Sequence, residues 1–282
     1  MRVIHDVDTM QGLARTRYGQ VSTALVPTMG ALHEGHLSLI RLAHDRAEQV
    51  DVTIFVNPTQ FGPGEDLEQY PRPLEDDLAA CRREGVTTVF CPQAGQMYAG
   101  DHSTLIAESV VSEGLCGRFR AGHFDGVVTV VAKLFNIMLP TVAVFGQKDY
   151  QQVCVIQRMV RDLAFPVEIV VAPIVREADG LAMSSRNRTL GADERARALA
   201  LSQGLMQARA DVAGGERDAR RLEQALSRAL GKAGLQVQYA ACVDADTLAP
   251  VRAVVRPTLF AVAALVGQTR LIDNVILQPR VE

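Results

Sequence analysis

The segment PTMGALHEGHLSLI (residues 27–40) carries two histidines, His33 and His36, at the start of an amphipathic stretch. Imidazole can ligate a metal ion, act as a general base or donate a hydrogen bond to a phosphate, and a surface histidine can also have no chemical role. The pattern H-E-G-H is one residue shorter than the H-E-x-x-H zinc motif, whose histidines share one face of a helix. Gly35 between the histidines further weakens a continuous helix. The spacing argues against zinc, so a general base, a phosphate donor or a plain surface position stays open for each histidine.

The elements that must position these histidines alternate between strand and helix. The sequence predicts strands at residues 23–28, 51–56, 86–92, 141–146 and 167–175. It predicts helices at residues 35–49, 74–85, 126–139 and 149–163. The strands are continuous apolar runs, as expected for a parallel sheet that helices cover on both faces. This alternation predicts an α/β fold with a doubly wound parallel sheet, which binds ligands at the carboxyl ends of its strands.

The pattern changes after about residue 175. Two Ala- and Arg-rich amphipathic helices are predicted within residues 192–215 and 216–234, and strands follow at 235–244, 258–267 and 270–278. The last two strands are separated by a short turn beside Gly267, which is typical of a hairpin. We therefore expect a first domain over residues 1–175 and a smaller C-terminal α+β domain over residues 176–282.

The composition limits the kinds of molecule that the protein is expected to bind. The 282 residues are 48% hydrophobic and 22% charged, and the formal net charge of −3 gives no reason to expect nucleic acid or a membrane as a partner. The five cysteines are scattered and include no C-x-x-C pair, which argues against a disulfide framework and against a cysteine-based zinc site. The N-terminus has no apolar leader, and no stretch is apolar enough to span a membrane. We expect a cytoplasmic protein.

The loop after the first predicted strand is suited to binding an anion, although neither standard glycine-rich signature is present. The chain has no G-x-x-x-x-G-K-[ST] motif and no G-x-G-x-x-G after residues 23–28. Gly30 would let the backbone approach a ligand closely, and a helix that begins near Gly35 presents N–H groups and the positive end of its dipole. We expect His33 and His36 to add N–H donors to a phosphate at this position.

Three further polar clusters follow predicted strands. They are Asn57 and Gln60; Gly146, Lys148, Asp149, Gln151 and Gln152; and Ser184, Ser185 and Arg186. Each cluster could also be purely structural, since Asn57 and Asp149 could be helix caps, the glutamines could be solvated and the serine loop could cap the next helix. Their recurrence at successive strand ends favours one ligand site. Lys148 and Arg186 can neutralise a polyphosphate, Asp149 can hold Mg²⁺, and the amides suit a hydroxylated organic acid.

Six motifs together resemble those of the pantothenate synthetase (pantoate–β-alanine ligase) family. They are PTMGALHEGHLSLI, FVNPTQF, YPRPLEDD, GRFRAGHFDGV, FGQKDYQQ and MSSRN, in this order between residues 27 and 187. The resemblance implies a nucleotidylyltransferase-type, Rossmann-like domain and a C-terminal lid domain, and usually a homodimer. LHEGH resembles the HIGH motif of that superfamily, and MSSRN resembles its KMSKS-type loop. Gln147 stands where the family often has a charged residue.

The resemblance implies that the chain uses MgATP to join pantoate to β-alanine through a pantoyl adenylate, with release of pyrophosphate and AMP. The residues implied to contact ATP are Met29, Gly30, Ala31, Leu32, His33, Glu34, Gly35, His36, Gly146, Gln147, Lys148, Asp149, Val175, Met183, Ser184, Ser185 and Arg186. Gln60 and Gln152 would bind pantoate, and Gln60 would also meet β-alanine. Asn57 is assigned to the substrate site with them.

We expect His33, His36, Lys148 and Arg186 to stabilise the departing pyrophosphate, because phosphoryl chemistry needs fixed positive charge and positioning. Whether His36 also transfers a proton is left open. Because an acyl adenylate is labile in water, we expect the second domain or the loop at residues 61–73 to close over it. Two competing functions stay open, namely a nucleotidyltransferase that keeps the nucleotide in its product and a non-catalytic nucleotide-binding module.

Overall fold

The computed structural model of the chain describes residues 1–279, which form two compact units. Unit 1 comprises Met1–Ser112, Arg120–Gln147 and Val155–Pro173. Unit 2 comprises Glu113–Phe119, Lys148–Cys154 and the described residues from Ile174 onward. Among the described residues, no helix combines the length and apolarity that a membrane crossing requires.

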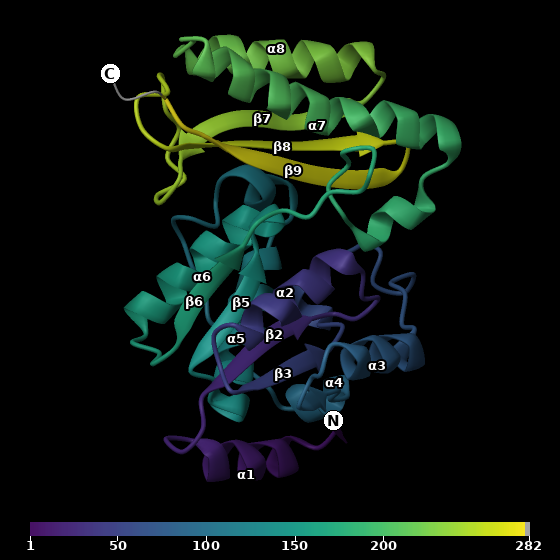
Figure 1. Cartoon of the computed structure of the whole chain (residues 1–282), viewed down its shortest axis with the longest axis vertical. Helices are drawn as coiled ribbons and strands as arrows, with labels where there is room; N and C mark the ends of the chain where they lie inside the picture. The colour runs from purple at the N-terminus through teal and green to yellow at the C-terminus, as the bar shows by residue number, and fades with distance from the viewer. Residues whose placement is uncertain (280–282) are drawn as a thin grey trace. The chain divides into compact units, whose positions relative to one another are not determined.

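Unit 1 contains a six-stranded sheet in the order β1-β4-β3-β2-β5-β6, and every neighbouring pair is parallel (Figure 1). The strands are β1 (Arg2–Ile4), β2 (Thr23–Thr28), β3 (Gln49–Ile54), β4 (Thr88–Phe90), β5 (Val142–Gly146) and β6 (Glu168–Ala172). The chain adds β3 and β4 on one side of β2, and β5 and β6 on the other. The order therefore reverses between β2 and β5, where a doubly wound sheet binds its ligands. The predicted parallel α/β fold is confirmed.

Most of the helices come from segments of mixed polarity that bury one side, but the segment His123–Met138 is mostly apolar and is buried on nearly all sides. They are α1 (Val7–Arg17), α2 (Glu34–His44), α3 (Leu74–Arg83), α4 (Ala94–Met97), α5 (His123–Met138) and α6 (Tyr150–Asp162). The short 3-10 helices are η1 (Pro58–Gln60), η2 (Leu115–Phe119), η3 (Gln147–Asp149) and η4 (Ser185–Thr189). The prediction extended α2 to residue 49, but the helix ends at His44 because Gln49 already pairs with Thr23 in the sheet. The elements β1, α1 and α4 were not predicted.

Unit 2 contains a three-stranded antiparallel sheet, β7 (Gln236–Asp244), β8 (Thr258–Val266) and β9 (Thr269–Leu277), in the order β7-β8-β9. The helices α7 (Ala192–Ala213) and α8 (Ala219–Lys232) lie together on one face of this sheet (Figure 1, green over yellow). Leu205, Leu226 and Phe260 are fully or almost fully buried where the two layers meet. The predicted hairpin of β8 and β9 is confirmed, since Val266 pairs with Thr269.

Candidate active site

The loop after β2 is held in an unusual backbone conformation by buried side chains. Gly30 has φ of +83° and Ala31 has φ of 51°, both in the left-handed region. The N–H groups of Ala31 and Leu32 donate to the two carboxylate oxygens of Asp77, at 2.8 and 2.7 Å. Gly30 N–H donates to the hydroxyl of Thr28 at 3.1 Å. These three N–H groups therefore support the loop from within, and Asp77 is a site residue to which the sequence motifs gave no role.

The lack of room for a side chain explains why residue 30 is a glycine. A Cβ atom on Gly30 would lie 2.9 Å from Asp77 Oδ2 and 3.0 Å from Ile54 Cγ2, so any side chain would push against the carboxylate that holds the loop. From the sequence we expect Gly30 to admit a ligand. In the structure its lack of a side chain admits Asp77, which is only 2% exposed.

The two histidines lie at the N-terminus of α2, as predicted. His33 is the residue that precedes the helix, and its backbone N–H donates to His36 Nδ1 at 3.3 Å. The two rings are close, with centroids 4.1 Å apart. Because His36 Nδ1 accepts a hydrogen bond, a neutral His36 carries its proton on Nε2. His36 therefore presents an N–H donor at a helix end whose dipole already favours an anion.

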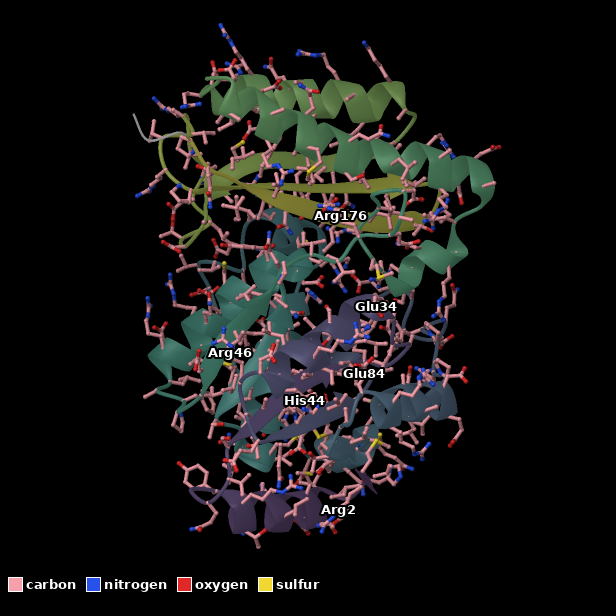
Figure 2. All side chains as sticks on the ribbon, viewed as in Figure 1. Arg2, Glu34, His44, Arg46, Glu84 and Arg176 are labelled. Atoms are coloured by element: carbon pink, nitrogen blue, oxygen red, sulfur yellow. The ribbon has the colours of Figure 1, made fainter. Side chains whose placement is uncertain are left out.

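Glu34, between these histidines, faces a different part of the surface. Its carboxylate pairs with Arg41, and Arg41 also pairs with Glu84 at 2.6 Å. Figure 2 shows Glu34 and Glu84 close to each other on the ribbon. The half-exposed Glu34 side chain thus belongs to a surface ion-pair group, which leaves its backbone as the part available to a ligand.

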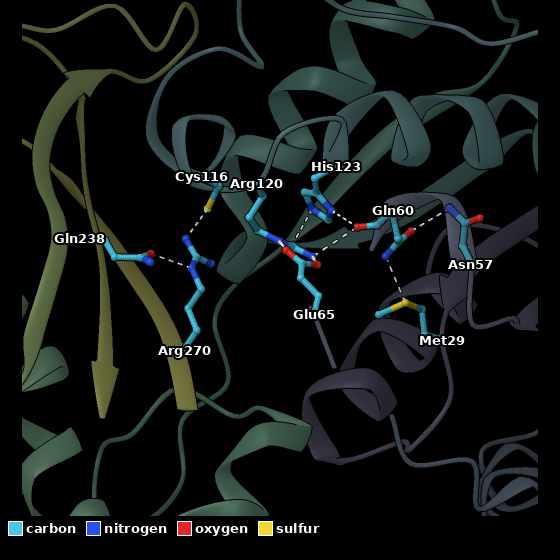
Figure 3. A network of polar contacts seen from close by, with 9 residues as sticks. All are labelled: Met29, Asn57, Gln60, Glu65, Cys116, Arg120, His123, Gln238 and Arg270. Carbon is cyan, nitrogen blue, oxygen red and sulfur yellow. Dashed lines mark hydrogen bonds and ion pairs between the residues drawn. The ribbon is translucent and has the colours of Figure 1, made fainter. Parts of the chain in front are cut away.

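Asn57 and Gln60 occupy the turn after β3 and are linked to each other. Asn57 is 1% exposed, and its Nδ2 donates both to Gln60 Oε1 and to the carbonyl of Gly126, each at 3.1 Å. Tyr98 donates its phenolic hydrogen to Asn57 Oδ1 at 2.8 Å. Gln60 Nε2 lies 3.1 Å from Met29 Sδ, so this amide reaches the loop after β2 (Figure 3).

A second network holds the backbone of the same turn. Arg120 forms an ion pair with Glu65 at 2.6 Å, and the Arg120 NH1 group donates to His123 Nε2 at 2.9 Å (Figure 3). An arginine N–H can only donate, so His123 carries its proton on Nδ1 and gives it to the carbonyl of Gln60 at 2.8 Å. Burial acts to raise the pKa of Glu65, but the hydrogen bond and charge of Arg120 lower it overall. Arg120 and His123 belong to the GRFRAGHFDGV motif, which was recognised in the sequence without a structural role.

In unit 2, Lys148 and Asp149 form part of the 3-10 turn η3. The Lys148 ammonium lies 3.6 Å from the Asp149 carboxylate, and the Lys148 carbonyl accepts a hydrogen bond from Asn274 Nδ2 at 3.0 Å. The neighbouring Asp273 is almost fully buried in an ion pair with Arg176 at 2.7 Å. Burial raises the pKa of Asp273 even though Arg176 opposes that rise. On β9, Asn274 thus holds the Lys148 main chain and Asp273 holds Arg176. The sequence motifs predicted neither contact.

The loop at residues 183–186 is also anchored within unit 2. Ser184 caps the 3-10 helix η4, which itself contains Ser185 and Arg186, by accepting from the Arg186 N–H at 3.3 Å. The following helix α7 begins after Gly191 and is not capped by this loop. Asn187 is 6% exposed and donates to Glu177 Oε1 at 2.6 Å and to the Ala182 carbonyl at 3.0 Å. Met183 and Val175 are joined through their main chains at 3.0 Å. Ser185 and Arg186, in the first turn of η4, are half-buried.

The two glutamines at the start of α6 differ in their surroundings. Gln151 is buried and bonds to main-chain groups of Cys116 and Gly114, at 2.9 and 2.8 Å. Gln152 is half-buried and has no side-chain hydrogen bond within residues 1–279. Of this pair, Gln152 is therefore the one whose amide can serve a substrate.

Within residues 1–279, no three side chains of the types His, Cys, Asp and Glu gather into a ready-made metal site. All five cysteines are buried free thiols. Burial raises the pKa of Cys81 to about 12 and that of Cys91 to about 11, so neither is a ready nucleophile.

The chain is similar to known proteins both in sequence and in overall structure. A family model described as pantoate-beta-alanine ligase matches residues 2–276. The chain is 53% identical over 253 residues to a pantothenate synthetase of Thermoanaerobacter sp. (strain X514), with 89% of each chain covered. It is similar to a solved pantothenate synthetase from Thermus thermophilus, with 40% identity, a TM-score of 0.94 and coverage of 99% of this chain and 100% of that chain. It is also similar to a pantoate-beta-alanine ligase from Francisella tularensis complexed with beta-gamma ATP and beta-alanine, with 30% identity, a TM-score of 0.83 and coverage of 98% and 97%.

Proposed function

Because the chain belongs to the pantoate–β-alanine ligase family, we propose that it joins pantoate to β-alanine through a pantoyl adenylate, with release of pyrophosphate and AMP. One observation carries the mechanism: Gln60 Nε2 lies 3.1 Å from Met29 Sδ, in the loop that leads to the histidines of α2. A carboxylate bound by Gln60 would lie next to a phosphate bound at the start of α2. Adjacent binding of the two reactants is what the first step requires.

In the first step, a pantoate carboxylate oxygen attacks the α-phosphorus of ATP, and the bond from this phosphorus to pyrophosphate breaks. A carboxylate is a poor electrophile, and its adenylate has AMP as a far better leaving group. His33 and His36 donate N–H groups to the phosphates at the N-terminus of α2. The hydrogen bond to His36 Nδ1 keeps the His36 proton on Nε2, so the ring is already oriented as a donor.

The proposed phosphate ligands in unit 2 are Lys148, Ser184, Ser185 and Arg186. Two of these are cationic, so they would neutralise charge that develops on the leaving pyrophosphate. The adjoining residues proposed to contact ATP are Gly146, Gln147, Val175 and Met183. The Asn274 amide fixes the Lys148 main chain, and the Asn187 amide fixes the end of the serine loop.

The residues present are suited to a magnesium ion that is bound together with the nucleotide. Mg²⁺ is usually bound by one or two carboxylates together with substrate phosphates and water. Asp149 has a side chain that is 47% exposed, beside Lys148, so a carboxylate oxygen can meet an ion held by ATP. When bound there, Mg²⁺ would neutralise phosphate charge, and the Asp149 carboxylate would orient it.

In the second step, the β-alanine amine attacks the acyl carbon of the adenylate and AMP leaves. Gln60 and Gln152 hold the pantoyl group through their amides during this step, and Gln60 also meets the amine. Their contribution is positioning, which can supply roughly 7–11 kcal/mol of the barrier reduction when reactants are well aligned.

We further propose that the enzyme is a cytoplasmic homodimer. Leu105 and Val110, which are 64% and 65% exposed in one non-helical segment of unit 1, are the residues that we expect at the contact. The five free thiols are typical of a reducing compartment. Sedimentation equilibrium should give twice the chain mass, and a Leu105→Glu variant should shift it toward the monomer. A monomeric wild-type protein would refute the dimer.

The activity is tested by ATP–pyrophosphate exchange with purified protein, Mg²⁺ and pantoate, in the absence of β-alanine. We expect exchange that depends on pantoate, followed by stoichiometric AMP release when β-alanine is added. Exchange without any carboxylate, or retention of the nucleotide in the product, would point to a nucleotidyltransferase instead. No exchange with pantoate or with other hydroxy acids would refute the ligase mechanism.

A further inference from the structure

The amide of Asn57 has its hydrogen-bonding capacity filled by the protein. An asparagine offers two N–H donors and two acceptor lone pairs. Both donors of Asn57 are in use, toward Gln60 Oε1 and the Gly126 carbonyl, each at 3.1 Å. Its Oδ1 accepts from the Tyr98 hydroxyl at 2.8 Å and the Thr59 hydroxyl at 2.9 Å. Burial raises the pKa of Tyr98, so this phenol keeps its proton. Asn57 therefore has no group left with which to bind a substrate.

Main-chain groups decide which way this amide faces. The Gly126 carbonyl can only accept, so the Asn57 atom beside it must be nitrogen. The Thr59 backbone N–H, 3.4 Å away, can only donate, so the atom that it meets must be oxygen. The orientation of Asn57 then decides that of Gln60, because the atom facing Asn57 Nδ2 must be the acceptor Oε1. Gln60 Nε2 consequently turns toward Met29.

A glycine at residue 126 makes this arrangement possible. A Cβ on Gly126 would lie 2.3 Å from the Thr59 carbonyl oxygen and 2.7 Å from Gln60 Cα, so no other residue fits without displacing η1. The first turn of α5 thus packs directly against the turn that carries Asn57 and Gln60. This close approach brings the Gly126 carbonyl within reach of Asn57 Nδ2.

We propose that Gly126, Asn57 and Tyr98 form an orientation relay that keeps the Gln60 amide with its N–H donors toward the substrate. The proposal rests on the function proposed above and makes Asn57 a positioning residue that acts through Gln60. Met29 Sδ is a weak acceptor, so a carboxylate or hydroxyl oxygen of the substrate replaces it readily. A flipped Gln60 would present Oε1 instead and repel a carboxylate oxygen, whereas pantoamide could turn its own NH₂ group toward Oε1. The relay therefore favours the carboxylate of the hydroxy acid.

The relay predicts a specific energetic coupling between Asn57 and Gln60. In Asn57→Asp the donor toward Gln60 is lost, so Gln60 Nε2 turns to the new carboxylate and Oε1 faces the substrate. By isothermal titration calorimetry, we expect the Kd for pantoate to rise roughly 10- to 100-fold and the Kd for pantoamide to change much less. In a Gln60→Ala background, the same Asn57→Asp change should alter the Kd for pantoate less than about twofold. An equal loss in both backgrounds, or for both ligands, would overturn the relay.

Asn136→Asp is the matched control, because Asn136 is exposed on α5 and undergoes the same chemical change. It should leave both affinities unchanged. If Asn57→Asp does not fold, Tyr98→Phe removes one donor to Asn57 without changing the packing. We expect it to raise the Kd for pantoate roughly 2- to 10-fold, and an unchanged Kd would contradict the relay.

An NMR measurement separates the relay from the ligase function. In the ligand-free wild-type protein, the Gln60 side-chain NH₂ protons should show NOEs to the Met29 methyl group, and Asn57→Asp should abolish them. Absence of NOEs from these protons to the Met29 methyl group in the wild type would overturn the relay even if pantoate binds. The expected NOEs together with no pantoate binding would refute the proposed function and leave the relay in place.

Discussion

The Asn57–Gln60 region of unit 1 and the Lys148–Asp149 region of unit 2 position polar groups in different ways. Asn57 and Gln60 are buried, and each side chain is itself held by neighbouring groups. Lys148 and Asp149 have side chains that are 22% and 47% exposed, and Lys148 is anchored through its carbonyl by Asn274. One region fixes the direction of an amide, and the other fixes the location of a charge.

The difference follows from what each region has to recognise. An amide distinguishes donors from acceptors only if it cannot flip, since the two orientations have nearly the same shape. A site built to hydrogen-bond a substrate also discriminates strongly against analogues that leave its groups unpaired. The attraction of an ammonium to phosphate falls slowly with distance and depends little on angle. We infer that the protein fixes the orientation of a side chain where it must select among ligands. It fixes only the position of a side chain where a charge is all that is needed.

The largest expected effect is the removal of a charge or donor that acts on the phosphates. Lys148→Ala and His36→Ala should each lower the adenylation rate by roughly 10²- to 10³-fold, the loss typical of one transition-state donor. The rate is measured as pantoate-dependent pyrophosphate exchange, with circular dichroism to check folding. Lys232→Ala, at the end of α8, is the control for loss of a lysine. Near wild-type rates for both variants would refute the proposed phosphate ligands.

The next effect tests the packing beneath the Asn57–Gln60 region. Gly126→Ala should lower the free energy of unfolding by about 1–3 kcal/mol, because the added methyl group overlaps the Thr59 carbonyl. It should also raise the KM for pantoate more than that for ATP. Gly12→Ala is the control, since nothing lies within 4 Å of its Cβ position in helix α1, and it should be neutral or stabilising. Urea unfolding provides the measurement, and equal stability of the two variants would contradict the packing.

The elements that the sequence predicts well are those with long apolar runs or clear periodicity. The range of β2 matches its predicted residues, and β8 and β9 differ from theirs by one residue at one or both ends. The helix α1 escaped prediction because only Met10 and Ala14 are buried along it. The helix α2 was predicted to be too long because residues 45–48 contain no glycine or proline to mark the end. Gln49 pairs with Thr23 in the sheet instead of continuing the helix, and this long-range contact is not visible in the local sequence.

The roles of the site side chains could likewise be predicted only where the residues involved lie close together in the sequence. His33 and His36 could be placed at a helix start because both lie in one local motif. Asp77 holds residues that lie 46 and 45 positions earlier, and the carbonyl that orients Asn57 lies 69 positions away. Asp77 in the sequence LEDD has the pattern of an ordinary acidic first turn. Asn57 was assigned to the substrate because it is an amide at the end of a predicted strand. Its hydrogen bonds to protein groups depend on a contact between residues that lie far apart in the sequence, which the sequence alone does not show.

A smaller effect tests the anchoring of the serine loop in unit 2. Asn187→Asp removes the donor to Glu177 and Ala182 and places two carboxylates together. We expect adenylation at low ATP to fall roughly tenfold, as for one hydrogen bond to a charged group, while the Kd for pantoate stays constant. Asn136→Asp again serves as the control. If pantoate affinity fell equally, the separation between the two regions would be wrong.

The smallest effect concerns the ion pair beneath Gln60. The pKa of Glu65 is lower in the folded protein than its ordinary value of 4.5, so Glu65 stabilises the fold fully above about pH 4.5. This contribution is lost as the pH falls through the folded-state pKa. Glu65→Gln should therefore lower the free energy of unfolding by up to about 1 kcal/mol at pH 7, with the difference vanishing in acid. Urea unfolding across this pH range measures it, with the exposed Glu68→Gln as control.

The same variant separates the two ways in which Arg120 could support the turn. If the Glu65 charge matters only for stability, Glu65→Gln changes unfolding and leaves the KM for pantoate unaltered. If the ion pair also holds Arg120 against the Gln60 carbonyl, 3.3 Å away, the KM for pantoate rises with the same pH dependence as the stability. A difference in stability that persists unchanged in acid would mean that packing of the Glu65 side chain, and not its charge, supports this region.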